Sequence, residues 1–561
     1  MTDSIYSPDV VIVGGGVAGL NAALNLAPRK VCVITKNSLG INTSSSWAQG
    51  GIAAPFAKED SNESHISDTL ATAKGLAKSE VVREVISESI NIIKDLENIG
   101  VEFDKNPDGT FNLGLEAAHS FNRIVKSKGD SSGIEIMRGL TEKVRSCNHI
   151  TILENVSIDS IMMENNTIYG VIGHLNNQNL PENNVVIQSP NVILATGGLG
   201  GIFANTTNPR TSYGEGIALA AEAGAAITDM EFVQFHPTGL DFGLDPTPLA
   251  TEAIRGEGAT LVNQHNERFM LDVHPQAELA SRDIIAQSIF DQIEKGNSVF
   301  LDCRENIGND FGKQFPQVQS YCDNADIDPS SELIPIIPVA HYHIGGVKTD
   351  LKGRSSVDGL WCCGEVAATG IHGANRLASN SILESLVFAK IVAEEINKCP
   401  IKKIDSVSQS FIKTYKEKTR NKIRAKKYIW QLRSSMMRNL GIVRNSQSII
   451  RGLRDIVRIE RESKGLSAKL NDMILVSKFI IVGAYKRKES RGCHLRSDYV
   501  TENDKYKLNI DQNLDSMELD IQKILDKESC ADEVIFLGDW FDDFNDGIND
   551  VVNVAKFLNS I

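Results

Sequence analysis

The sequence of 561 residues predicts a doubly wound α/β fold of the Rossmann type, with an inserted α+β domain and a C-terminal helical domain. Three observations support this prediction. A buried β-branched run at residues 10–13 leads into a glycine-rich turn and a helix-forming stretch. Residues 239–345 interrupt this β-α-β pattern with Pro-rich connections and charged motifs. Residues 401–500 are basic and helix-forming, which indicates a helical domain with a positive face.

The elements follow in order along the chain. Residues 10–13, a helix reaching Leu26 and a second strand at 31–35 form the first β-α-β unit. A loop rich in Ser, Asn and Gly spans 37–51, and residues 68–100 show apolar residues at helical spacing. Buried strands are expected at 191–196 and 360–363, on either side of the inserted domain. The acidic stretch beyond about residue 505 is expected to be a short helical or disordered appendage.

Composition narrows the class of protein. Hydrophobic residues make up 41% and charged residues 23%, as in ordinary globular proteins. The net charge of -14 argues against nucleic acid and anionic membranes as partners, although a locally positive cleft remains compatible with it. Nine cysteines without a C-x-x-C pair argue against a zinc or iron–sulfur site, so no metal is expected. Neither an export signal nor a run of ~20 apolar residues is present, and a cytoplasmic location is expected.

The glycine-rich turn after the first strand is a candidate dinucleotide site. A plain β-α turn is the alternative, but the preceding buried strand and the following helix favour phosphate binding at the helix N-terminus. The generic pattern has an Asp or Glu about 20 residues on, where this chain has Thr35-Lys36. The candidate residues of the turn are Gly14, Gly15, Gly16, Val17, Ala18 and Gly19.

A second motif, Ser44-Ser45-Ser46-Trp47-Ala48-Gln49-Gly50-Gly51, resembles the S/T-x-x-A-Q/E-G-G segment of the fumarate reductase/succinate dehydrogenase/aspartate oxidase flavoproteins. The resemblance continues at residues 195–198, 364–365, 370–381 and 487–494, and covers roughly residues 8–500. It implies FAD as the cofactor and makes a lysine after the second strand expected. The further cofactor residues that it implies are Lys36, Ser44, Ser45, Ser46, Trp47, Ala48, Gln49, Gly50, Gly51, Glu215 (usually Asp in relatives), Glu365, Ser381 and Ile382.

The expected domains follow from the changes of composition and pattern along the chain. Residues 1–238 and 346–400 form the two parts of an FAD-binding domain, and residues 239–345 form a capping domain that contributes to the substrate site. Residues 401–505 form the helical domain, and residues 506–561 form the acidic tail.

Four charged clusters and Arg376 indicate a site for a dicarboxylate, because each desolvated carboxylate needs charge-assisted donors. Taken singly, a histidine or a Glu-x-x-Arg pair has an ordinary structural explanation, but together they occur in the order of the family. The candidate substrate ligands are His236, Thr251, His341, Arg376 and Gln234.

In relatives an Arg-Glu-Arg chain carries a proton to the substrate, and Arg282, Glu252 and Arg255 match it. Arg282 is therefore the expected proton donor when fumarate is reduced. During aspartate oxidation it has either the reverse role or an electrostatic one, and the sequence leaves both open. Arginine is a poor general base because its pKa exceeds roughly 12.

Two residues distinguish branches of the family. Covalent members attach FAD through a histidine where this chain has Ser44, so non-covalent FAD is expected. Glu116 resembles the glutamate of the E-x-x-H-S-x-x-R-I motif of aspartate oxidases, which meets the substrate amino group, although relatives usually have Gly-Gly at Ala117-Ala118.

The implied activity is oxidation of L-aspartate to iminosuccinate, the first step of de novo NAD synthesis, with oxygen or fumarate as acceptor and quinolinate synthase as metabolic partner. The nearest alternative is a flavoprotein subunit of fumarate reductase or succinate dehydrogenase. A non-catalytic flavin-binding regulator is the alternative of a different class, and the proton relay argues against it.

Overall fold

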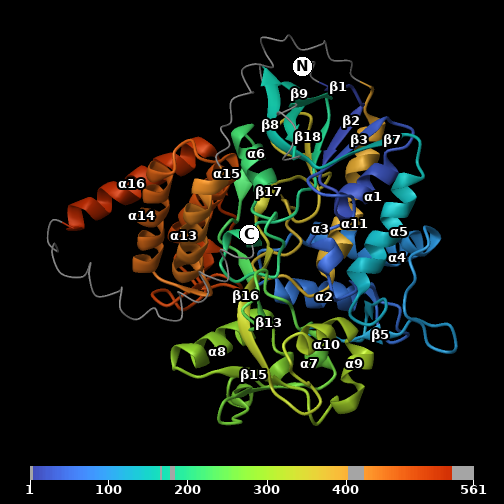
Figure 1. The fold of residues 1–561 in the computed structure, drawn as a ribbon, viewed down its shortest axis with the longest axis vertical. Coiled ribbons are helices and arrows are strands. Elements are labelled where there is room, and N and C mark those ends of the chain that lie inside the picture. Colours follow the sequence, from blue (N-terminus) through green and yellow to red (C-terminus); the bar gives the residue numbers. More distant parts are fainter. Residues whose placement is uncertain (1–3, 165–166, 177–183, 402–421, 533–561) are drawn as a thin grey trace.

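The computed structural model describes residues 4–164, 167–176, 184–401 and 422–532. Figure 1 shows three regions: a sheet flanked by helices, a capping domain below it with α7 to α10, and a helical domain to one side with α13 to α16. This arrangement confirms the predicted fold class. The domain boundaries themselves stay predictions.

A five-stranded parallel sheet is the centre of the Rossmann-like part. Its first two strands in the chain, β2 and β3, have the bounds expected from their β-branched runs. From one edge to the other, the strands are β18 (Leu360–Cys362), β11 (Val192–Leu194), β2 (Val10–Val13), β3 (Val31–Thr35) and β7 (Ile150–Glu154).

Strands β18, β11, β2 and β3 are buried on both faces, which explains why they are mainly apolar, whereas the edge strand β7 is partly exposed and includes Thr151 and Glu154. Val10 and Ile12 pack into one hydrophobic cluster, while Val11 and Val13 pack into another. Helices α1 (Val17–Asn25), α3 (Ser79–Ser87), α4 (Ser89–Asn98), α5 (Ser132–Arg145) and α11 (Asn380–Lys398) contribute to the first cluster. The second includes the sheet of β1 (Ser4–Tyr6), β10 (Asn184–Gln188), β9 (Thr167–Leu175) and β8 (Val156–Glu164), and helix α6 (Glu215–Glu222).

The capping domain has an antiparallel sheet and a hydrophobic cluster of its own, which runs from Leu240 to Ile336. The expected boundary at residue 239 falls inside its first strand, so the strand pair β13–β16 links this domain to the Rossmann-like part. The strands are β13 (Val233–Leu240), β16 (Ile334–His343), β15 (Val299–Asp302) and β14 (Thr260–Asn263). The helices are α7 (Ala253–Gly256), α8 (Arg282–Glu294), α9 (Phe311–Gln314) and α10 (Pro316–Asp323).

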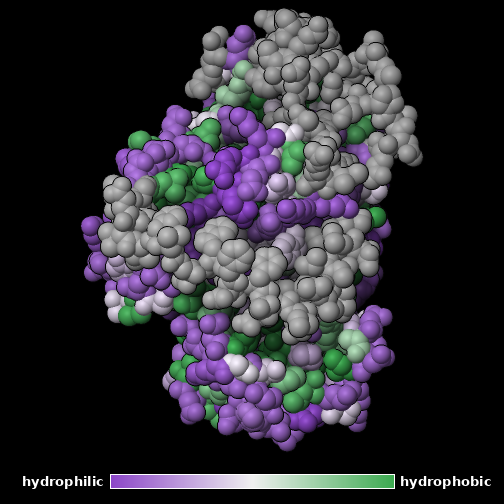
Figure 2. Space-filling view, turned by 60° about the vertical axis from the view of Figure 1, so that its left-hand side comes forward, coloured by the Kyte–Doolittle hydropathy of each residue, from purple (hydrophilic) through white to green (hydrophobic). Residues whose placement is uncertain are grey.

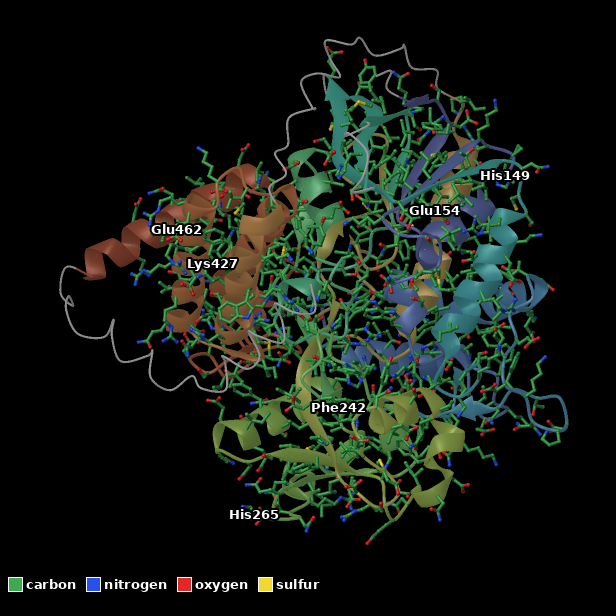
Figure 3. The ribbon with its side chains drawn as sticks, viewed as in Figure 1. His149, Glu154, Phe242, His265, Lys427 and Glu462 are labelled. Carbon is green, nitrogen blue, oxygen red and sulfur yellow. The ribbon has the colours of Figure 1, made fainter. Side chains whose placement is uncertain are left out.

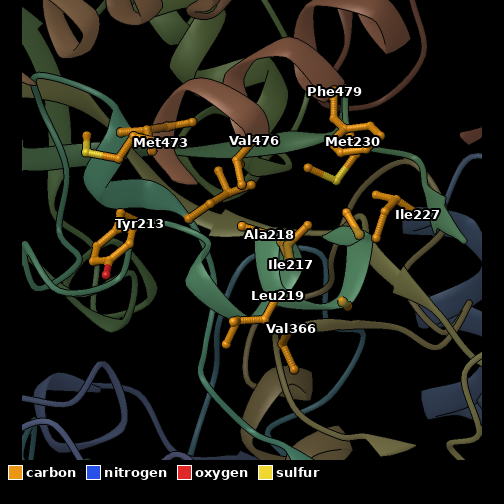
Figure 4. Packing of buried hydrophobic residues seen from close by; sticks show 14 of the residues in the cluster. Tyr213, Ile217, Ala218, Leu219, Ile227, Met230, Val366, Met473, Val476 and Phe479 are labelled. Carbon is orange, nitrogen blue, oxygen red and sulfur yellow. The ribbon is translucent and has the colours of Figure 1, made fainter. Parts of the chain in front are cut away.

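The helical domain shares its core with the Rossmann-like part instead of forming a separate one. Figure 4 shows Met473, Val476 and Phe479 of α15 beside Ile217 and Ala218 of α6, and all five belong to one buried cluster. The main helices are α13 (Lys422–Leu440), α14 (Ser446–Glu462) and α15 (Ala468–Lys486). Because the core is continuous, this domain packs directly against the Rossmann-like part.

The chain beyond residue 505 departs from the expected appendage. Strand β22 (Asp511–Gln512) pairs with β12 (Ile227–Thr228) in a sheet that also includes β17 (Gly346–Lys348) and β19 (Ala367–Ala368). Helix α16 (Leu514–Asp532) buries Met517, Ile521 and Ile524 in the shared core. These apolar residues lie at helical spacing, which the acidic composition concealed. The rest of the expected tail, residues 533–561, lies outside the described residues.

The remaining short strands order the loops around the site. Strands β4 (Ile52–Ala53), β6 (Ile124–Val125) and β5 (Leu113–Gly114) form one small sheet near α2 (Asn62–Thr72), and β20 (Val443–Arg444) pairs with β21 (Leu495–Arg496). The described surface in Figure 2 is mainly hydrophilic. Within the described ranges, no helix combines the length and the hydropathy needed to cross a bilayer.

Candidate active site

A cavity of about 1170 Å³ lies where the Rossmann-like part, the capping domain and α13 meet. Phe242, which lines it, stands at the edge of the capping domain that faces the rest of the molecule (Figure 3). Most residues selected from the sequence line this cavity: Gly14, Gly15, Gly16, Val17, Ala18, Lys36, Ser44, Ser45, Trp47, Ala48, Gln49, Gly50, Gly51, Glu116, Glu215, His236, Thr251, Glu252, Arg282, His341, Glu365, Arg376, Ser381 and Ile382.

Four of the selected residues do not line the cavity, and their roles stay predictions: Gly19, Ser46, Gln234 and Arg255. A Cβ at Gly19 would stand 2.0 Å from the carbonyl oxygen of Gly14, so this glycine allows helix α1 to pack on the turn. The Ser46 hydroxyl donates to the carbonyl of Thr43 (2.8 Å) and closes a turn. Gln234 and Arg255 hold other site residues, as described below.

The glycine turn gives the cavity an end suited to a pyrophosphate. Gly14 has φ +122°, and a Cβ there would stand 2.1 Å from the carbonyl oxygen of Ala195, so no other residue fits. Helix α1 begins after Gly16, which offers no side-chain cap, and the N–H of Val17 donates to Ser45 Oγ (3.2 Å). The other N–H groups of this turn and the positive dipole end suit a bound phosphate.

The lysine at the end of β3 is neutralised by a residue far along the chain. Lys36 Nζ lies 2.6 Å from Glu215 Oε2 and donates to the hydroxyl of Tyr213 (3.1 Å). Glu215 therefore neutralises the charge of Lys36.

Glu365 presents a carboxylate to the same cavity. Its Oε1 accepts the backbone N–H of His343 (2.9 Å), while its Oε2 accepts no hydrogen bond from the described residues. Burial raises the pKa of Glu365 to about 7. A partly buried carboxylate with one free oxygen facing the cavity fits a sugar hydroxyl, so the residues present fit FAD at this end.

At the other end of the cavity, Arg282 and Glu252 form a buried ion pair. Arg282 donates from Nε to Glu252 Oε2 (2.6 Å) and from Nη1 to Gln234 Oε1 (3.1 Å). Arg255 lies 3.4 Å from Glu252 on the opposite oxygen and is fully buried. Burial alone would raise the pKa of Glu252, but the charges of Arg282 and Arg255 outweigh it and hold the pKa below its usual value. Glu252 is therefore ionised between two arginines.

Arg376, by contrast, is only partly satisfied. Its guanidinium lies 4.4 Å over the ring of Tyr342, and its Nη1 donates weakly to the hydroxyl of Ser381 (3.3 Å). No described residue accepts from its Nε, and burial with the nearby charge of Arg282 lowers its pKa to about 10. A buried guanidinium without a carboxylate partner is the donor that an anionic ligand requires.

Gln234 connects the two arginines. Its amide nitrogen donates to the carbonyl of Arg376 and to Oδ1 of Asn375, both at 2.9 Å, while its oxygen accepts from Arg282. Gln234 thus positions Arg282 and Arg376 from behind the cavity wall.

Two neutral histidines complete the donor set. The rings of His236 and His341 lie 5.0 Å apart, and both line the cavity beside Thr251. Burial, followed by the charge of Arg282, holds the pKa of each ring well below its usual value. Neither ring therefore carries a charge at neutral pH, and each can donate one hydrogen bond from a single nitrogen.

Glu116 is the additional carboxylate in this cavity. Its side chain is buried, and Ser379 Oγ donates to its Oε2 (2.7 Å). Burial and the negative charge of Glu252 raise its pKa, although Arg282 and Arg376 act in the opposite direction.

The loop that carries Glu116 is anchored on both sides. His119 Nε2 lies 3.0 Å from the carbonyl of Ala378, and Arg123 donates to both oxygens of Asp60 at 2.9 Å. Ala118 has φ +64°, a conformation that favours the glycine common in relatives.

Several lining residues were not predicted from the sequence. Thr207, Ser379 and Tyr342 contact His341, Glu116 and Arg376 respectively, and α13 contributes Trp430, Arg433 and Ser434. Ser379 lies inside the 370–381 segment and could have been selected with Ser381. Thr207 and the residues of α13 carry no sequence signal, because only the tertiary fold brings them to the cavity.

The basic segment near residue 490 also acquires a structural role. Cys493 donates its backbone N–H to the carbonyl of Ala374 (2.9 Å), and its Sγ lies 3.1 Å from Asn375 Oδ1. This contact supports the loop that carries Arg376 from behind.

Comparison with known proteins assigns the class. The family model described as "FAD binding domain" matches residues 9–382, and "Fumarate reductase flavoprotein C-term" matches residues 430–524. A quinol fumarate reductase structure from E. coli is similar with a TM-score of 0.84 and 25% identity, covering 91% of this chain and 96% of that chain. The fold and the site therefore define an FAD-dependent oxidoreductase of the fumarate reductase flavoprotein class.

Curated relatives narrow the family within this class. The chain is 44% identical to L-aspartate oxidase of Agrobacterium fabrum, covering 87% of this chain and 91% of the relative. It is 36% identical to L-aspartate oxidase of Bacillus subtilis, again covering 87% and 91%. The chain belongs to the L-aspartate oxidase family, and its cofactor is FAD.

Proposed function

We propose that this protein oxidises L-aspartate to iminosuccinate with FAD, and passes the electrons to oxygen or fumarate, as the first step of de novo NAD synthesis. The identity to L-aspartate oxidases supports this choice over a fumarate reductase or succinate dehydrogenase subunit. A cytoplasmic location and capture of the unstable product by quinolinate synthase belong to the proposal through the resemblance.

The charge of the substrate end is the observation that carries the proposal. Three arginines (Arg255, Arg282 and Arg376) and two glutamates (Glu116 and Glu252) leave one net positive charge when all are ionised. L-aspartate has two carboxylates and one ammonium, so its single net negative charge balances the single net positive charge of this site. Fumarate and succinate carry two negative charges and no cation, and match the site better when Glu116 is protonated. Glu116 therefore distinguishes the amino acid from its analogues.

In the proposed mechanism the residues bind and orient aspartate before the reaction. Arg376 binds one carboxylate, and His236, His341 and Thr251 supply further donors from the walls. Glu116 meets the ammonium group and, because its pKa is raised, can accept the proton that this group must lose before the Cα–H bond breaks. FAD, when bound, supplies the acceptor for the hydride from Cα.

Arg282 has a different task in each direction of the reaction. When fumarate is reduced, it donates the proton, and Glu252 with Arg255 replaces it. When aspartate is oxidised, Arg282 acts through its positive charge, which is paired with Glu252.

The decisive experiment is anaerobic mixing of the holoenzyme with L-aspartate while the flavin absorbance is followed. Aspartate should bleach the flavin, whereas succinate should perturb its spectrum without reducing it. Bleaching by succinate and not by aspartate would favour the succinate dehydrogenase alternative.

The FAD is proposed to be non-covalent, because Ser44 lacks the imidazole that covalent relatives use. Its hydroxyl lies 3.3 Å from that of Ser212, and neither can form such a bond. Acid precipitation should therefore release all of the yellow colour into the supernatant, and colour in the pellet would contradict the proposal.

A further inference from the structure

The contact between His341 and Thr207 determines what this histidine can offer a ligand. The Nδ1 atom of His341 lies 2.8 Å from Thr207 Oγ1, and the ring is neutral at ordinary pH. A neutral ring has one N–H, so either Nδ1 donates to the threonine or the threonine donates to Nδ1. In the second arrangement the proton is on Nε2. No described residue is a hydrogen-bond partner of Nε2, so this N–H can donate to a ligand in the cavity.

The neighbouring histidine provides a reference. Nδ1 of His236 faces two groups of Thr238 at 3.3 Å: the backbone N–H, which donates to it, and the hydroxyl, which donates its own proton to the carbonyl of Ala250 (2.7 Å). A backbone N–H can only donate, so this contact is made when Nδ1 of His236 has no proton and Nε2 carries it. In that tautomer His236 is a hydrogen-bond donor toward the cavity.

Thr207 is the corresponding element for His341. No other described residue accepts a hydrogen bond from its hydroxyl, so donation to Nδ1 satisfies both groups. The opposite arrangement would leave the Nε2 lone pair facing an anionic ligand. We propose that the hydroxyl of Thr207 donates to Nδ1 of His341 and thereby fixes this histidine as an Nε2–H donor to a substrate carboxylate. The proposal rests on the dicarboxylate substrate of the proposed function and makes Thr207 a positioning residue.

The surrounding backbone keeps this contact in place independently of the hydroxyl. The backbone N–H of Thr207 donates to the carbonyl of Ala340 (3.0 Å), and the side-chain amide of Asn208 donates to the carbonyl of His341 (2.8 Å). Thr206 also donates its hydroxyl to Ala340 (2.9 Å) but does not contact the ring. Removing the Thr207 hydroxyl therefore changes the donor and not the path of the chain.

The first test is the binding of succinate to the oxidised holoenzyme, followed by the flavin difference spectrum. Thr207→Val keeps the shape and removes the donor, and should weaken succinate binding about ten- to a hundred-fold. Thr207→Ser keeps the hydroxyl and should restore affinity to within about threefold of wild type. Thr206→Val is the matched control: it removes a hydrogen bond to the same strand, and should lower the melting temperature while leaving succinate affinity close to wild type.

The second test observes the tautomer directly by ¹⁵N NMR of holoenzyme labelled at histidine, with the His341 signals assigned from their loss in His341→Gln. Wild type with succinate should show an unprotonated Nδ1 and a protonated Nε2, and Thr207→Val should show a mixture of tautomers. A protonated Nδ1 in wild type, unchanged affinity in Thr207→Val, or an equal loss in Thr206→Val would overturn the inference. Failure of aspartate to bleach the wild-type flavin would instead overturn the proposed function, because these binding tests do not require turnover.

Discussion

The two ends of the cavity are lined by different kinds of groups. The cofactor end consists of backbone and small residues around Gly14, and its lysine is already neutralised by Glu215. The substrate end gathers buried charged side chains from four separate segments, which carry Glu116, Glu252, Arg282 and Arg376. The cofactor end therefore binds through shape and N–H groups, whereas the substrate end depends on a balance of charge that a ligand of the right charge completes.

A similar contrast separates the two arginines of the substrate end. Arg282 is fully paired with Glu252 and Gln234, whereas Arg376 lacks a carboxylate. The paired arginine is suited to the proton relay, and the unpaired one is suited to hold the ligand. Predictions that separate the two ends, and then the two arginines, follow from this difference.

The largest effect is expected at the cofactor end. Gly14→Ala places a Cβ 2.1 Å from the Ala195 carbonyl in a backbone conformation that alanine avoids, so the turn must change and FAD retention should be lost. The flavin content of the purified protein measures this, with circular dichroism to verify folding. A folded, fully yellow variant would show that the turn is not the cofactor end.

At the substrate end, Arg376→Leu should weaken succinate binding by roughly thirty- to several-thousand-fold, because loss of one buried charge-assisted partner costs about 2–5 kcal/mol. FAD content should stay at the wild-type level. The difference spectrum with succinate gives the affinity, and an affinity like that of wild type would remove Arg376 from the site.

Arg282→Leu should act mainly on turnover. The variant should lose most fumarate reduction and keep more succinate affinity than Arg376→Leu, because Arg376 and both histidines remain. Stopped-flow measurement of the reduced enzyme with fumarate tests this. Equal losses of affinity in the two variants would contradict the assignment of separate tasks.

The pH dependence should also distinguish the substrates. The pKa of Glu116 is raised, so this group becomes protonated at a higher pH than an ordinary glutamate. Aspartate requires the ionised form, and its kcat/KM should fall as the pH decreases through that raised pKa, by about tenfold per pH unit below it. Fumarate reduction should hold or increase over the same interval. Parallel profiles for the two substrates would argue against this role of Glu116.

The two ends also differed in how far the sequence predicted them. Most of the predicted cofactor residues line the cavity, because Gly14 to Ala18 and Ser44 to Gly51 are contiguous motifs, of which Ser46 alone does not line it. The charged residues of the substrate end were selected through their family order, but their pairing was not. Gln234 and Arg255 lie behind the wall, and Thr207 reaches His341 across 134 residues of sequence. Such partners depend on tertiary packing, which leaves no periodic signal in the chain.

The central claim is that Glu116 makes the substrate end specific for an amino acid. Glu116→Gln preserves the shape of the side chain and the contact with Ser379 but removes the negative charge that meets the ammonium. A lost charged hydrogen bond of about 1.5–3 kcal/mol lowers specificity roughly ten- to a hundred-fold.

The most direct measurement compares two half-reactions in one preparation of Glu116→Gln. One is flavin reduction by L-aspartate without oxygen, and the other is reoxidation of the chemically reduced enzyme by fumarate. The charge balance predicts that the aspartate reaction falls steeply while the fumarate reaction survives or improves. Equal losses in both would contradict it, and would make Glu116 a structural residue of the cavity.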